Sequence, residues 1–192
     1  DPPAAHSEQS VPPKAHKLFA KVPASESGIS FQNKITETPE LNYLNYNNMF
    51  TGGGVACGDL NNDGLPDLYF TGNLVEDQLY LNQGNLKFTD ISSTAITNGN
   101  EGWHRGVVFT DVNTDGHLDI YVCRSGPETD PAQRTNLLYI NNGEADSPTF
   151  TESAEAYGLA DTSHSTQAVF FDYDKDGDLD CYVLNHPSER RP

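Results

Sequence analysis

The sequence has little positive charge and no long hydrophobic run. Eleven Lys and Arg residues stand against 28 Asp and Glu residues, which gives a formal net charge of −17. This balance argues against nucleic acid and anionic membranes as partners, because both attract basic surfaces. No apolar run approaches the length of a membrane span, and no Asn-x-Ser/Thr sequon occurs. We therefore expect neither a membrane span nor N-linked glycan of that kind.

Cysteine is also scarce, with three residues in the chain. An odd count leaves at least one thiol without a disulfide partner in the same chain. When the repeats described below are aligned, Cys57 falls where Phe109 and Phe170 fall, at a strand position that we expect to face the core. We therefore interpret the cysteines as small buried apolar side chains in preference to a disulfide, although their pairing stays open.

Acidic residues, by contrast, are concentrated in three short stretches. They read DLNNDGLPD at residues 59–67, DVNTDGHLD at 111–119 and DYDKDGDLD at 172–180, and the third has five carboxylates in nine residues. All three follow the plan D-x-[DN]-x-D-G-x-x-D. Carboxylates this close repel one another unless a cation lies between them, so the pattern predicts a bound metal ion.

Each position of this plan suits a hard cation with oxygen ligands. Side-chain oxygens at positions 1, 3 and 5 converge when the backbone wraps tightly, and Gly64, Gly116 and Gly177 at position 6 permit that wrap. Position 7 varies from apolar to acidic, as expected where the backbone carbonyl is the ligand, and the Asp at position 9 closes the site. These features predict calcium.

An EF-hand would need a Glu at position 12 and a helix on each side of the loop. Position 12 is Phe70, Val122 or Val183 here, within the segments LYF, IYVC and CYVL, which are typical of strands. The loops are therefore expected to join strands. The alternative, that Asp, Asn and Gly simply form turns, is weakened by the presence of three copies.

A second pattern repeats along with the loops. Segments 77–92 and 135–153 each contain a strand ending in Leu-Tyr-(Leu/Ile)-Asn, a Gly turn and a strand with Phe-Thr-(Asp/Glu). The unit therefore has two hairpins, and its first Asp recurs after 52 and then 61 residues. Four-stranded repeats of this length indicate propeller blades. We predict an all-β fold, a partial β-propeller of about two and a half four-stranded blades, each with a calcium loop between its first strands.

The chain divides into two parts on composition. Residues 1–27 are rich in Pro and poor in apolar residues, which predicts an extended leader. Residues 28–192 form the predicted blades, with repeats near 53–92, 105–153 and 166–186.

Several segments resemble a known family. GGGVACGDLNNDGLPDLYFTGN, LYLNQGNLKFTDIS, GWHRGVVFTDVNTDGHLDIYV and STQAVFFDYDKDGDLDCYVLNH are similar to the FG-GAP or VCBS-type calcium-binding β-propeller repeats of integrin α-chain heads. They resemble more closely the repeats of bacterial cartilage-acidic-protein-like proteins that carry an ASPIC/UnbV domain. The resemblance spans about residues 28–186. It implies an extracellular or cell-surface β-propeller with structural calcium.

When the family's ligand positions are matched to this sequence, the resemblance implies three calcium sites. The implied ligands of the first are Asp59, Asn61, Asp63, Leu65 and Asp67; those of the second are Asp111, Asn113, Asp115, His117 and Asp119; those of the third are Asp172, Asp174, Asp176, Asp178 and Asp180.

The departures from this family leave two alternatives open. A closed propeller needs about four to eight blades, whereas this chain supplies two complete repeats and half of a third, with no ASPIC/UnbV-like segment. Either the chain is a fragment of a longer protein, or something else covers its open strand edges. Such edges favour self-association into a ring or filament, which we keep as a hypothesis.

The expected function is that of a secreted, non-enzymatic, calcium-binding structural or adhesive module. Its expected partners are further copies of itself and extracellular protein or glycan. The alternative is a fragment of a larger secreted propeller that binds or processes polysaccharide, with an acid pair such as Glu101 and Asp111, or with His104 beside Arg105. No nucleophile motif supports that alternative.

Overall fold

The computed structural model describes residues 19–96, 102–127 and 130–187. Strands dominate this part of the chain, which confirms the all-β prediction. The helical pieces have four residues each and are α1 (Ala24–Ser27), α2 (Ser92–Ala95) and the 3-10 turn η1 (Pro131–Arg134). Within the described ranges, no helix has the length and apolar character needed to cross a membrane.

The strands form three antiparallel sheets in simple chain order. The first sheet contains β1 (Val55–Gly58), β2 (Asp67–Phe70), β3 (Gln78–Asn82) and β4 (Phe88–Asp90). The second contains β5 (His104–Thr110), β6 (Asp119–Arg124), β7 (Leu137–Asn141) and β8 (Phe150–Glu152). The third pairs β9 (Ser165–Phe171) with β10 (Asp180–Asn185). The first two sheets therefore share one topology, which the third begins to repeat.

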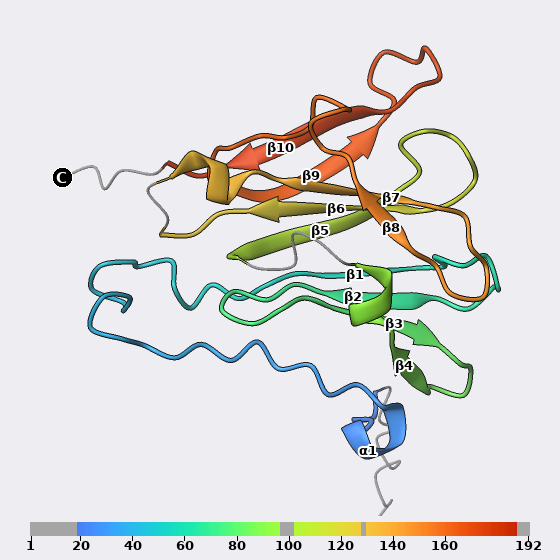
Figure 1. Cartoon of the computed structure of the whole chain (residues 1–192), viewed down its shortest axis with the longest axis horizontal. Coiled ribbons are helices and arrows are strands. Elements are labelled where there is room, and N and C mark those ends of the chain that lie inside the picture. The colour runs from blue at the N-terminus through green and yellow to red at the C-terminus, as the bar shows by residue number, and fades with distance from the viewer. Residues whose placement is uncertain (1–18, 97–101, 128–129, 188–192) are drawn as a thin grey trace, which may run out of the picture.

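The three sheets stack on one another, with the second in the middle (Figure 1). β5 of the second sheet contacts both β1 of the first and β9 of the third. The N-terminal part of the described chain first runs beneath the first sheet in this view and then loops round beside it before β1 begins. Most of the predicted leader lies outside the described residues, and its last four residues form α1.

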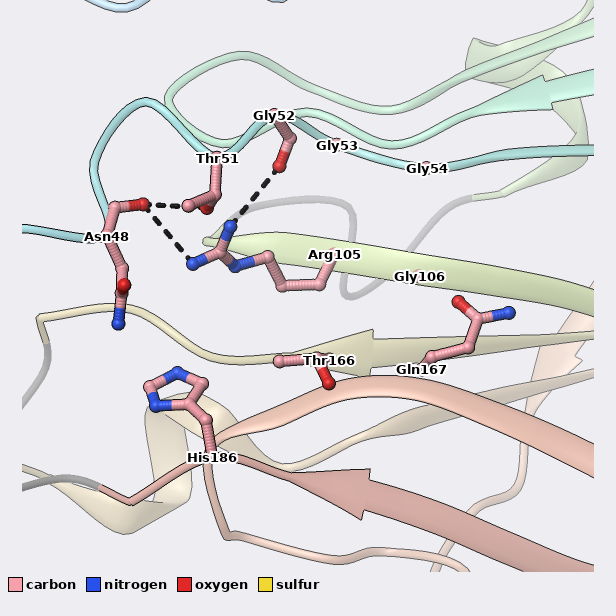
Figure 2. A pocket seen from close by; sticks show the side chains of 10 residues that line it. All are labelled: Asn48, Thr51, Gly52, Gly53, Gly54, Arg105, Gly106, Thr166, Gln167 and His186. Atoms are coloured by element: carbon pink, nitrogen blue, oxygen red, sulfur yellow. Dashed lines mark hydrogen bonds between the residues drawn. The ribbon is translucent and has the colours of Figure 1, made fainter.

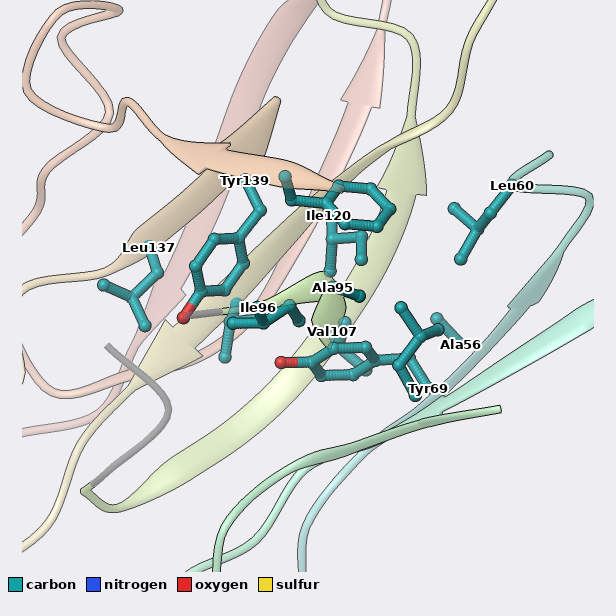
Figure 3. Close-up of a cluster of buried hydrophobic side chains, with 12 residues drawn as sticks. Ala56, Leu60, Tyr69, Ala95, Ile96, Val107, Ile120, Leu137 and Tyr139 are labelled. Atoms are coloured by element: carbon teal, nitrogen blue, oxygen red, sulfur yellow. The ribbon is translucent and has the colours of Figure 1, made fainter. Parts of the chain in front are cut away.

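The largest core cluster fills the space between the first two sheets (Figure 3). Tyr69 of β2 is fully buried against the second sheet, where Val107 of β5 and Ile120 of β6 face it. α2 adds Ala95 to the same cluster. A second cluster lies between the second and third sheets, around Tyr121. Successive side chains of a strand point to opposite faces of its sheet. The middle sheet therefore contributes buried side chains to both clusters, one on each face.

The expectation that the cysteines are buried is wrong for Cys57. Cys123 is buried and Cys181 is half-buried, but Cys57 is exposed, and all three thiols are free. Cys57 is exposed because its sheet is the first of the stack. Phe109, at the equivalent place in β5, packs against the core cluster between the first two sheets. No sheet among the described residues covers the outer side of β1.

Candidate metal centre

Each acidic stretch forms the loop between the first two strands of its sheet. Residues 59–66 join β1 to β2, residues 111–118 join β5 to β6, and residues 172–179 join β9 to β10. The loops share positive φ at Gly64, Gly116 and Gly177. The residue two places earlier in each loop also has positive φ, although it is Asn62, Thr114 or Lys175. A left-handed non-glycine residue at the same place in three loops indicates a specific wrap rather than a generic turn.

The first Asp of each loop accepts backbone N–H groups of its own loop; in the third loop, Asp172 accepts those of Lys175 at 2.6 Å and Gly177 at 3.2 Å. Asp59 accepts the backbone N–H of Asp63 at 3.1 Å and that of Gly64 at 2.7 Å. Asp111 does the same in the second loop, with 3.1 Å to Asp115 and 2.9 Å to Gly116. These bonds fold the loop inward, so that the side chains at positions 1, 3 and 5 come together.

The third loop gives the clearest measure of this convergence. Asp172, Asp174 and Asp176 each offer a carboxylate oxygen, and these atoms all lie within 4.8 Å of one another. Calcium binds oxygen at 2.3–2.6 Å, so ligands on opposite sides of the ion are about 5 Å apart. The spacing and the oxygen-only donor set both fit calcium.

The last Asp of the loop makes a different set of contacts. Asp67 is buried and accepts the backbone N–H of Leu60 at 2.9 Å and that of Asn82 at 2.8 Å. It therefore ties the loop to β3. Each carboxylate oxygen has a second lone pair, so these bonds leave Asp67 able to contribute to a metal site as well.

The second loop repeats this arrangement through Asp119, which accepts from Val112 and Asn141, both at 2.9 Å. In the third loop, Asp180 accepts from Tyr173 at 2.7 Å. Asp180 has no such bond to a later strand among the described residues, where the third sheet has two strands.

The electrostatics of these carboxylates favour a cation. Burial raises the pKa of Asp67, and the charges of Asp63 and Asp59 raise it further, against the lowering effect of the two N–H donors. Asp119 has a raised pKa for the same reasons. In the third loop, a hydrogen bond with Asp176 raises the pKa of Asp178. A bound divalent ion would stabilise the ionised form of all of them.

The first two loops also touch each other. The amide of Asn62 donates to the backbone carbonyl of Gly116 at 3.1 Å, and its nitrogen lies 3.2 Å from Nδ1 of His117. The sequence pattern contained no signal for this contact, because it joins residues of two separate repeats. It makes the position of one loop dependent on the other.

A buried polar contact between sheets was not predicted either. Asp77, just before β3, lies 2.7 Å from Nδ1 of His104 at the start of β5, and both side chains are almost fully buried. Asp77 also accepts the hydroxyl of Tyr69 at 2.8 Å and the N–H of Gly72 at 2.7 Å. Burial, followed by the charge of Asp77, raises the pKa of Tyr69 well above its usual value.

At the equivalent position between the second and third sheets, two uncharged side chains form the contact. Asn136 precedes β7 as Asp77 precedes β3, and its amide donates to the hydroxyl of Ser165 in β9 at 2.9 Å. It also donates to the hydroxyl of Tyr121 at 2.9 Å. Aligning the repeats would have paired Asp77 with Asn136, but no spacing rule shows that both reach the next sheet.

Asp77→Ala is expected to destabilise the fold by about 3–5 kcal/mol, because it leaves a buried hydroxyl, N–H and imidazole without their acceptor. Tyr69→Phe removes one of these bonds and should cost about 1 kcal/mol. Urea unfolding in saturating calcium measures both. Equal effects of the two variants would contradict the central role given to Asp77.

The segment GWHRG is partly buried and partly lines a cavity. Trp103 and His104 are buried, and Glu101 lies outside the described residues. Arg105 lines a cavity of about 370 Å³ between the starts of β5 and β9 and the glycine run at 52–54 (Figure 2). Its guanidinium donates to the carbonyls of Asn48 and Gly52, at 3.2 and 3.4 Å. These bonds give Arg105 a structural role at the wall of the cavity, away from the acidic loops.

Comparison with known proteins agrees with this arrangement. The family described as FG-GAP-like repeat matches residues 59–122, which run from the first acidic loop to the strand after the second. The match supports placing this part of the chain among FG-GAP-type repeats, a class of β-propeller-type modules. No curated protein matches the chain.

Proposed function

We propose that this chain is a calcium-binding β-propeller-type module that serves as a structural or adhesive scaffold outside the cell and has no enzymatic activity. On this proposal each sheet is one blade, so the described residues hold two four-stranded blades and two strands of a third. One observation carries the proposal, namely that three acidic loops join the first two strands of their sheets and share positive φ at the same two loop positions. The proposed ligands are the fifteen residues named from the sequence.

Calcium would make these loops rigid and offset their charge. Three bound ions would change the formal net charge from −17 to −11. The loops and the contact between Asn62 and Gly116 would then hold adjacent blades in register. An extracellular location follows from the same chemistry, because weak extracellular-type calcium sites fill at the millimolar calcium found outside cells.

Isothermal titration calorimetry on the full chain tests the proposal. We expect about three calcium ions per chain, and about two after Asp111→Ala, which removes the residue that organises the second loop. Glu155→Ala, at an exposed turn away from the loops, is the matched control and should leave the stoichiometry unchanged. Absence of calcium binding by the folded chain would refute the proposal.

A further inference from the structure

The cavity beside Arg105 contains a buried positive charge without a counterion. Arg105 is 7 % exposed, and no carboxylate among the described residues forms an ion pair with it. This is unexpected in a chain with 28 Asp and Glu residues, because a buried charge is costly unless it is paired. The environment of Arg105 therefore suits an anion from outside the chain.

The hydrogen bonds of Arg105 compensate its charge only in part. Its guanidinium donates to the carbonyl of Gly52 and to the hydroxyl of Tyr46, both at 3.4 Å, and to the carbonyl of Asn48 at 3.2 Å. These distances are at or beyond the long end of the usual range. The Nε atom is buried and has no hydrogen-bond partner in the described part of the chain. All three acceptors are uncharged, so the charge of the guanidinium is not neutralised.

The cavity has the size of a small-molecule site. Its volume is about 370 Å³, which lies within the range of known ligand pockets. Its walls come from the segment that leads into β1, from β5 and β9, and from His186, which follows β10. In Figure 2, the guanidinium of Arg105 and the ring of His186 lie on opposite sides of it. All the lining residues belong to this chain, and none of them lies in an acidic loop.

The other lining side chains offer uncharged hydrogen-bonding groups. The side-chain amides of Asn48 and Gln167 make no hydrogen bond with the described residues, so they are available to a ligand. The hydroxyls of Thr51 and Thr166 donate to backbone carbonyls at 2.8 and 2.9 Å, which leaves their oxygens able to accept. Amide groups and hydroxyl oxygens of this kind suit the hydroxyl groups of a ligand.

We propose that this cavity binds a hydroxylated carboxylate, a sugar acid, with its carboxylate beside the guanidinium of Arg105. The planar guanidinium matches the geometry of a carboxylate. A carboxylate has a single negative charge, so a chain with a formal charge of −17 repels it less than it repels a phosphate dianion. The site is independent of the proposed calcium sites, because it uses none of their residues.

Titration of the full chain with D-glucuronate in saturating calcium, followed by NMR of the backbone amides, tests the proposal. We expect a dissociation constant of about 1 mM or lower, with the largest shifts at residues 48–54, 105–106 and 166–167. D-glucose, which lacks the carboxylate, should bind about 10-fold more weakly. Absence of shifts at these residues, or inorganic phosphate binding there as tightly as glucuronate, would overturn the proposal.

Two variants of the cavity wall test the named groups. Arg105→Gln removes the charge and should weaken glucuronate binding by about 10–100-fold. Because Arg105 also bonds to the backbone at Asn48 and Gly52, Gln167→Ala tests an exposed wall residue without changing the arginine, and it should weaken binding by about 2–10-fold. Glu155→Ala, at an exposed turn outside the cavity, is the control and should bind as the wild type does. Unchanged binding by the Gln167→Ala chain and by a folded Arg105→Gln chain would refute the site.

A short oligosaccharide that contains glucuronate distinguishes a free sugar acid from one within a polysaccharide. Equal affinity for the monomer and the oligosaccharide supports a free sugar acid, whereas tighter binding of the oligosaccharide supports a polysaccharide. Calorimetry with calcium on the same sample separates the two proposals of function. A chain that binds three calcium ions but no glucuronate refutes only the cavity site, whereas a chain that binds glucuronate but no calcium refutes only the calcium module.

Discussion

Adding a chelator to the calcium-loaded chain is expected to lower its melting temperature by roughly 15–30 °C. A ligand present at 100 times its dissociation constant stabilises the folded state by about 2.7 kcal/mol per site, so three such sites contribute about 8 kcal/mol. For a chain of this size, each kcal/mol shifts the melting temperature by about 2–4 °C. Differential scanning fluorimetry with and without chelator measures the change.

Two neighbouring residues of the third loop separate ligand loss from general loop damage. Asp174 is one of the converging carboxylates, whereas Lys175 beside it is an exposed residue that the proposal assigns no ligand role. In calcium, Asp174→Ala should lower the melting temperature by several degrees and Lys175→Ala by much less. In chelator, the difference between them should largely disappear. Equal melting of the two variants in calcium would show that the ligand assignment is wrong.

Asp119→Ala is expected to destabilise the chain even when no calcium is present. Asp119 is buried, and its carboxylate accepts the N–H groups of Val112 and Asn141, at 2.9 Å each. The substitution leaves both groups unsatisfied at about 1–3 kcal/mol each, which corresponds to a fall in melting temperature of roughly 5–20 °C.

Asp115→Ala is the matched comparison in the same loop. Asp115 is exposed, and the proposal gives it a ligand role, so its removal should matter in calcium and be almost silent in chelator. Thermal melts of both variants under the two conditions give the four values needed. If Asp119→Ala is also silent in chelator, the structural role assigned to the last Asp of the loop is wrong.

The sequence predicted those features that depend on local pattern. The apolar runs after the acidic loops form β2, β6 and β10, and the Gly turns fall between the third and fourth strands of the first two sheets. The loop positions follow from the Asp and Gly spacing, since a tight wrap must use nearby residues. Local chemistry determines both features, so a single sequence is enough to recognise them.

Features that depend on contacts between repeats were missed. The pairing of Asp77 with His104 joins residues 27 positions apart in different sheets. The left-handed backbone at Lys175 has no signature in residue type, because glycine or asparagine would be expected there. The exposure of Cys57 depends on whether another sheet covers β1, which its strand pattern does not encode.

The most direct test of the central claim is an anomalous difference map from crystals grown in calcium, with diffraction data collected at long wavelength. The account predicts three peaks, one within each of the loops at residues 59–67, 111–119 and 172–180, each surrounded by oxygen atoms. Peaks outside these loops, or loops without peaks in saturating calcium, would contradict it.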